Sequence, residues 1–101
     1  MMIRDLFSDE LALGAICRQY HIQRLAVFGS TLKGTDRPDS DIDLLVEFEP
    51  DHKPGLLALA HIEVELSTLT GGRSVDPRTA QDLSRHFRDE VVATAEVLYA
   101  A

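Results

Sequence analysis

Two aspartates separated by one residue, Asp41 and Asp43, are the side chains whose spacing most clearly predicts chemistry. In an extended strand, residues i and i+2 lie on the same face with their Cα atoms about 6.6 Å apart, at about 3.3 Å per residue. Both carboxylates therefore converge on one side of the strand, while Ile42 points to the other. Like charges this close repel and raise the pKa of one carboxyl, whereas Mg²⁺ prefers carboxylate oxygens and turns the repulsion into binding. The pair predicts a metal site.

A glycine–serine pair, Gly29-Ser30, follows a short apolar run, and ten residues separate it from Asp41. Glycine allows the backbone to approach a ligand closely, and the serine hydroxyl with the following N–H groups can hold phosphate oxygens. A metal beside a phosphate predicts phosphoryl or nucleotidyl transfer, because this chemistry asks the protein mainly for positioning and charge neutralisation.

A third carboxylate should complete such a site, and Asp76 is the first candidate. It ends a short predicted strand, which could deliver it to the edge that carries Asp41 and Asp43. There it would ligate the metal and accept a proton from an incoming hydroxyl. Asp82 is the alternative, and the sequence does not decide between the two.

Glycine and proline divide the chain into the elements that must position these residues. Ser8 is expected to cap the first helix, and Pro77 is expected to close the third strand. The apolar spacing predicts helices over about 8–20 and 56–70, strands over 25–28, 41–48 and 73–76, a single turn at 30–34, and a terminal helix whose apolar stripe runs from Phe87 to Tyr99. This order predicts an α/β (α+β) fold with a small mixed β-sheet flanked by helices.

Composition restricts the function classes. The 101 residues fit one domain, 1–101, and 10 basic against 17 acidic residues give a net charge of −7, with 45% hydrophobic residues. Direct binding to duplex nucleic acid is therefore not expected. With one cysteine, Cys17, no signal segment and no apolar run long enough to span a membrane, we expect a cytoplasmic protein. The four histidines have no paired ligand spacing and are expected at the surface or partly buried.

The motif Gly29-Ser30, ten residues, then Asp41-x-Asp43 resembles that of the nucleotidyltransferases of the DNA polymerase beta superfamily, and more narrowly the minimal nucleotidyltransferases. The detailed resemblance runs from about residue 25 to 47. It implies a nucleotidyltransferase fold that takes NMP from an NTP with Mg²⁺. It assigns triphosphate binding to Gly29 and Ser30, and catalysis with metal binding to Asp41, Asp43 and Asp76.

The resemblance also implies a partner. Minimal nucleotidyltransferases are similar to the antitoxins paired with HEPN-domain RNase toxins, which are understood to transfer AMP from ATP to a tyrosine of the toxin. A chain of this size leaves no room for its own acceptor domain, so we expect the acceptor from outside, within a hetero-oligomer with the toxin. Two alternatives stay open: a catalytically silent module that neutralises the toxin by occlusion, and a nucleotidyltransferase that acts on a small molecule or RNA.

Overall fold

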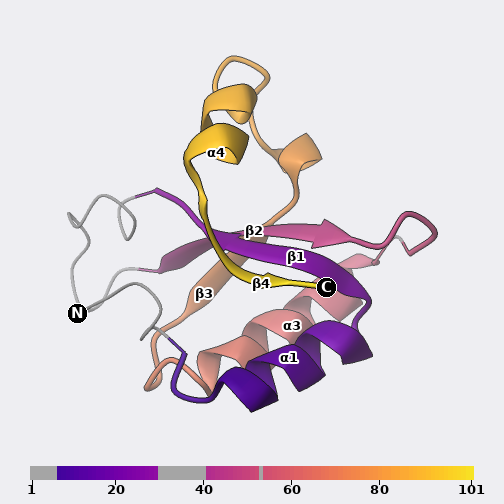
Figure 1. Ribbon diagram of the computed structural model, residues 1–101, viewed down its shortest axis with the longest axis vertical. Helices are drawn as coiled ribbons and strands as arrows, with labels where there is room; N and C mark the ends of the chain where they lie inside the picture. Colours follow the sequence, from indigo (N-terminus) through magenta and orange to yellow (C-terminus); the bar gives the residue numbers. More distant parts are fainter. Residues whose placement is uncertain (1–6, 30–40, 53) are drawn as a thin grey trace.

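Four strands form one mixed sheet in the order β3-β2-β1-β4 (Figure 1). The computed structural model describes residues 7–29, 41–52 and 54–101. The strands are β1 (Ile22–Val27), β2 (Ile42–Phe48), β3 (Val75–Arg78) and β4 (Glu96–Ala100). β1 pairs antiparallel with both β2 and β4, and β2 pairs parallel with β3. The predicted small mixed sheet is confirmed.

Two helices, α1 (Glu10–Gln19) and α3 (Leu56–Ser67), lie side by side on one face of this sheet (Figure 1). Asp9, and not the expected Ser8, caps α1, because its Oδ1 accepts hydrogen bonds from the N–H groups of Leu11 and Ala12 at 3.0 and 3.1 Å. Among the described residues, no helix is both long and apolar enough to cross a membrane.

The core lies between the sheet and these two helices. Alternate residues of β2 are buried there, with Ile42 and Leu44 wholly inaccessible to solvent. They belong to one hydrophobic cluster with Ile62 and Leu66 of α3. Because side chains alternate across a strand, the intervening residues, from Asp43 onward, lie on the opposite, open face. Burial of one face of β2 therefore orients the acidic residue on the other.

The terminal helix predicted to reach Tyr99 is wrong in its last part. A short 3₁₀ helix, η2 (Ala80–Asp82), is followed by α4 (Arg88–Thr94), and the chain then enters β4 beside β1. Leu98 and Tyr99 have a spacing that also fits a helix, but in β4 they pack against the main core. Backbone pairing with β1 and this burial outweigh the local helical pattern. A local pattern contains no information about the edge of a strand that is distant in sequence.

Pro77 lies within β3 and does not close it. Its Cα partner is Leu44 of β2, and the strand continues to Arg78. Among the described strands, β3 lies at one edge of the sheet and pairs with β2 alone. An edge strand tolerates proline because the missing N–H group can face away from the ladder. The strand is thereby longer at this end than the sequence predicts.

Candidate active site

The sheet register brings Asp76 beside Asp43. The two residues are Cα partners across the parallel strands β2 and β3, and such strands lie about 4.8 Å apart. The N–H of Ile42 donates to the carbonyl of Ser74 at 2.9 Å, which holds the beginnings of both strands together. Asp41 directly precedes β2 and is exposed. Three predicted site residues thus gather at one end of two neighbouring strands.

Electrostatic repulsion in this group acts mainly on Asp43. Partial burial, then the negative charge of Asp76 and, more weakly, that of Asp41, raises the pKa of the Asp43 carboxyl, while nearby Arg78 lowers it in part. The side chain has therefore lost water without gaining a sufficient positive partner. An arrangement of this kind is expected where a cation binds, because the cation removes the penalty that the carboxylates impose on one another.

Gly29 provides the space that the Asp43 carboxylate occupies. It follows β1 with a φ of +75°, and the N–H of the preceding Phe28 donates to the Asp43 carbonyl at 3.1 Å. A Cβ atom placed on Gly29 would collide with Oδ2 of Asp43 and would lie 3.2 Å from its Cγ. Glycine is thus required here both by its backbone conformation and by close approach. Ser30 and the turn predicted at 30–34 lie outside the described residues.

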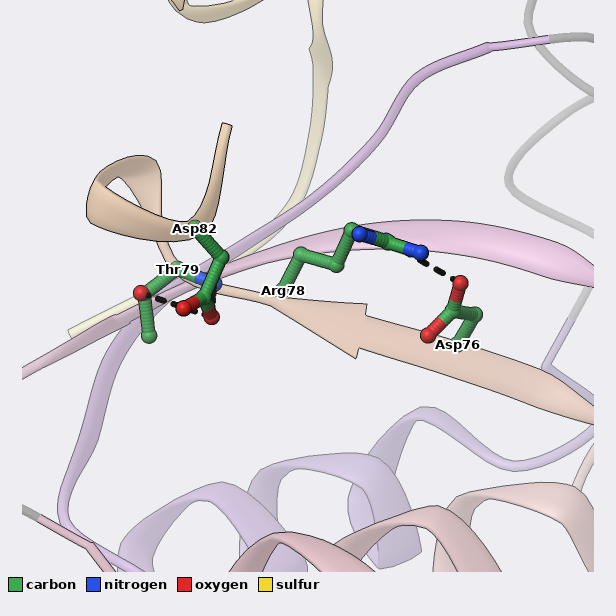
Figure 2. Close-up of polar contacts among 4 residues, drawn as sticks. All are labelled: Asp76, Arg78, Thr79 and Asp82. Atoms are coloured by element: carbon green, nitrogen blue, oxygen red, sulfur yellow. Dashed lines mark hydrogen bonds and ion pairs between the residues drawn. The ribbon is translucent and has the colours of Figure 1, made fainter. Parts of the chain in front are cut away.

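Asp82, the alternative third carboxylate, has a different place (Figure 2). It lies in η2, and its Oδ2 accepts hydrogen bonds from the backbone N–H and the hydroxyl of Thr79 at 3.1 and 3.0 Å. Its carboxylate completes a capping box at the start of η2, whereas Asp76 lies further back along β3. The structure therefore brings Asp76, and not Asp82, into register with Asp43.

Arg78 is a site neighbour that the sequence pattern does not indicate. Its Nε donates to Oδ2 of Asp76 at 3.1 Å, as Figure 2 shows. The two residues share a face only because β3 continues through Pro77, beyond the end predicted from sequence. A predicted strand that continued through Pro77 would have placed Asp76 and Arg78 on the same face, and could have revealed this neighbour. The positive charge of Arg78 also lowers the pKa of Asp43 in part.

A cleft of about 800 Å³ lies over the open face of the sheet, and neither Asp43 nor Asp76 is among its lining residues. Its lining includes Ala26 of β1 and Leu45 of β2, which are Cα partners, together with Thr79 and with Val92 of α4. Leu45 lies two residues after Asp43 and therefore on the same face. Its surface is mixed, with apolar side chains such as Leu45 and polar ones such as Thr79.

The chain matches known proteins in both sequence and structure. The Nucleotidyltransferase domain family matches residues 10–96. The protein adenylyltransferase MntA of Thermococcus cleftensis is 38% identical over 55 residues, so the match covers only 54% of this chain and 54% of that curated relative.

Solved structures extend the likeness. A protein assigned as a minimal nucleotidyltransferase is 36% identical, superimposes with a TM-score of 0.67 and matches 85% of each chain. A toxin–antitoxin structure with AMP-PNP has a TM-score of 0.70 at 22% identity, covering 92% of this chain and 74% of that one. The complex of a tri-AMPylated HEPN toxin with its MNT antitoxin from Shewanella oneidensis has a TM-score of 0.61 at 19% identity, covering 91% and 70%. These last two likenesses show the fold. The family match over most of the chain and the 36% identical structure show more: the chain belongs to the nucleotidyltransferase domain family, among its minimal members.

Proposed function

We propose that this protein is an antitoxin that transfers AMP from ATP to a tyrosine of a HEPN-domain toxin, in the cytoplasm and with Mg²⁺. The observation that carries the proposal is the register that brings Asp76 beside Asp43, with Gly29 directly against Asp43. This arrangement offers carboxylates to a metal where a glycine turn can admit a triphosphate.

In the proposed reaction, the tyrosine oxygen forms a bond to the α-phosphorus of ATP. The bond from that phosphorus to the bridging oxygen of the β-phosphate breaks, and pyrophosphate leaves. Asp76 accepts the phenolic proton, while Gly29 and Ser30 hold the triphosphate in line. Each residue's role is positioning or proton transfer, which is what this class of reaction requires of a protein.

The residues fit Mg²⁺ by the chemistry of their donors. Asp41, Asp43 and Asp76 offer only carboxylate oxygens, and the raised pKa of Asp43 marks a site where negative charge is insufficiently balanced. When bound, Mg²⁺ supplies neutralisation of the charge on the triphosphate and on the departing pyrophosphate. Arg78 pairs with Oδ2 of Asp76, one of the two oxygens of that carboxylate.

The nature of the acceptor is supported by the relatives and by the open face of the sheet. The curated relative is an adenylyltransferase of proteins, and one solved neighbour is an antitoxin bound to an AMPylated HEPN toxin. The open-face cleft, with Leu45 and Val92 among its lining residues, suits an aromatic side chain. A net charge of −7 also suits a basic partner such as an RNase.

The proposal is tested by incubating the protein with labelled ATP, Mg²⁺ and the protein encoded by the neighbouring gene, and measuring the mass of that partner. We expect a gain in whole AMP units. Asp43→Asn and Asp76→Asn should each reduce the rate by about 100-fold or more. Asp82→Asn is the matched control, because it removes a carboxylate of the same strand-to-helix segment that serves only as a cap, and it should keep most of the rate.

The other outcomes identify the rival functions. A partner that is bound and inhibited without any mass gain would contradict the proposal and favour an occluding module. Label recovered on RNA or on a small molecule, with none on the partner, would contradict the protein acceptor while keeping the nucleotidyltransferase. Equal loss in Asp82→Asn and Asp76→Asn would overturn the assignment of the third carboxylate.

A further inference from the structure

We propose that His21, Glu49 and His52 form a second metal site, suited to a transition-metal ion such as Zn²⁺. The three lie where β1 begins and β2 ends, at the right of Figure 1. The six residues of β1 separate this end from Gly29 and the carboxylates, which corresponds to about 20 Å. The site is therefore independent of the proposed Mg²⁺ site and does not rest on the proposed function.

The spacing of the donor atoms fits one ion. Glu49 Oε2 lies 3.3 Å from Nδ1 of His21 and 3.6 Å from Nδ1 of His52. One ligating atom from each of the three residues can be chosen so that all lie within 4.8 Å of one another. Zinc binds nitrogen and carboxylate oxygen at about 2.0–2.2 Å, so ligands at the corners of a tetrahedron lie about 3.3–3.6 Å apart. The two separations between the carboxylate and the imidazoles thus match those of a zinc coordination sphere.

Backbone contacts hold the three residues together without help from their side chains. The N–H of Glu49 donates to the carbonyl of His21 at 2.9 Å, and the N–H of His52 donates to the carbonyl of Glu49 at 2.9 Å. His21 has a φ of +59°, the one described non-glycine residue with a positive value. A side chain in this conformation is uncommon, and here it presents an imidazole to Glu49. Much of the ordering that a metal site requires is thus supplied by the fold.

The donor chemistry distinguishes this cluster from an ordinary ion pair. Two imidazoles and one carboxylate form a set used by zinc sites that keep a fourth position open to water. All three side chains are about half exposed, which leaves room for that water. The two rings are stacked, with centroids 3.6 Å apart and an interplanar angle of 9°. Binding of a shared ion would require these exposed rings to rotate out of the stacked arrangement, so that a nitrogen lone pair of each faces the ion.

A bound ion would link the start of β1 to the segment after β2. Glu49 and His52 also line the open-face cleft, so the ion would place positive charge at its border. The sequence spacing of the histidines does not reveal the cluster, because His21 lies on a different segment from the other two ligands.

The test measures binding of Zn²⁺ to the tag-free protein by calorimetry. Excess Mg²⁺ is present throughout, so that it occupies the carboxylate site. We expect one strongly bound Zn²⁺ per chain, and visible absorption typical of tetrahedral Co²⁺ when cobalt replaces zinc. His21→Asn, Glu49→Gln and His52→Asn should each weaken binding by at least about tenfold. Asparagine at position 21 tolerates the left-handed backbone, so that variant should stay folded.

Two controls make the result decisive. His86→Asn removes an exposed histidine outside the cluster, and Asp43→Asn alters the carboxylate site; both should keep the wild-type affinity for Zn²⁺. Absence of Zn²⁺ binding by the folded wild type would overturn the proposal. So would an affinity that survives in the His21→Asn/His52→Asn double variant but disappears in Asp43→Asn, since the ion would then occupy the carboxylates.

Discussion

Replacing Gly29 with alanine separates the two reasons for a glycine beside the carboxylates. Gly29 has a φ of +75°, and its added Cβ would collide with Oδ2 of Asp43. Gly71 has a φ of +70°, and nothing among the described residues lies within 4 Å of its Cβ position. The two substitutions therefore impose the same kind of backbone strain, and only the first disturbs Asp43.

The expected losses of stability follow from the backbone strain that both variants share and from the collision that only Gly29→Ala creates. A left-handed conformation costs an L-residue about 1–2 kcal/mol, so Gly71→Ala should lower the free energy of unfolding by about that amount. Gly29→Ala carries the same cost plus that of forcing Asp43 off its preferred rotamer, about 0.5–1.5 kcal/mol. Each kcal/mol corresponds to about 4–8 °C in Tm for a domain of this size. Moving the carboxylate should also reduce AMP transfer by about 100-fold, whereas Gly71→Ala should leave it nearly unchanged.

Urea unfolding and AMP transfer should be measured for both variants, and unfolding again in an Asp43→Ala background. With Asp43 truncated, only its Cβ remains near the new methyl group, at 3.4 Å, which is an ordinary contact. Gly29→Ala should then cost no more than Gly71→Ala. An equal cost of Gly29→Ala in both backgrounds, or normal activity of that variant, would refute the argument that the glycine makes room for the carboxylate.

Three further predictions concern the carboxylate, the cysteine and the core. Because the pKa of Asp43 is raised in the folded state, the stability that the protonated carboxyl contributes is present at low pH and is lost as the pH rises through that pKa. In Mg²⁺-free buffer at neutral pH, Asp43→Asn should therefore unfold at higher urea than wild type. The difference in urea midpoint between the variant and wild type should disappear in acid. A difference that does not change with pH would contradict the attribution to the Asp43 charge. Burial raises the pKa of Cys17 to about 12 and leaves its side chain inaccessible to solvent. A thiol reagent should therefore modify Cys17 only at the rate of unfolding, and rapid modification of the native protein would contradict this packing. Ile62→Ala should cost about 2–5 kcal/mol in urea unfolding, against about 0.5 kcal/mol or less for the exposed Val64→Ala; similar costs would show that α3 is packed differently.

Local pattern was sufficient for the parts of the site that lie within one element. The apolar alternation from Ile42 onward places Asp43 on one face of a strand, and the structure confirms that strand with its buried partners. The helices predicted over 8–20 and 56–70 are confirmed as α1 and α3, each shorter than predicted at one end or both. These features follow from periodicity, which the order of residues alone contains.

Tertiary structure decided everything that depends on which segments lie side by side. The parallel register of β2 and β3 places Asp76, and not Asp82, beside Asp43, and the same pairing extends β3 through Pro77 to Arg78. A free edge of β1 turns residues 96–100 from an expected helix into β4. The meeting of His21 with Glu49 and His52 likewise depends on the β1–β2 pairing. Sequence by itself determined the fold class, the Asp41 and Asp43 pair and the glycine that follows the first strand. The pairing of Asp76 with Asp43, the last strand and the histidine cluster needed non-local pairing, whose free energy comes from contacts between distant residues that no local pattern records.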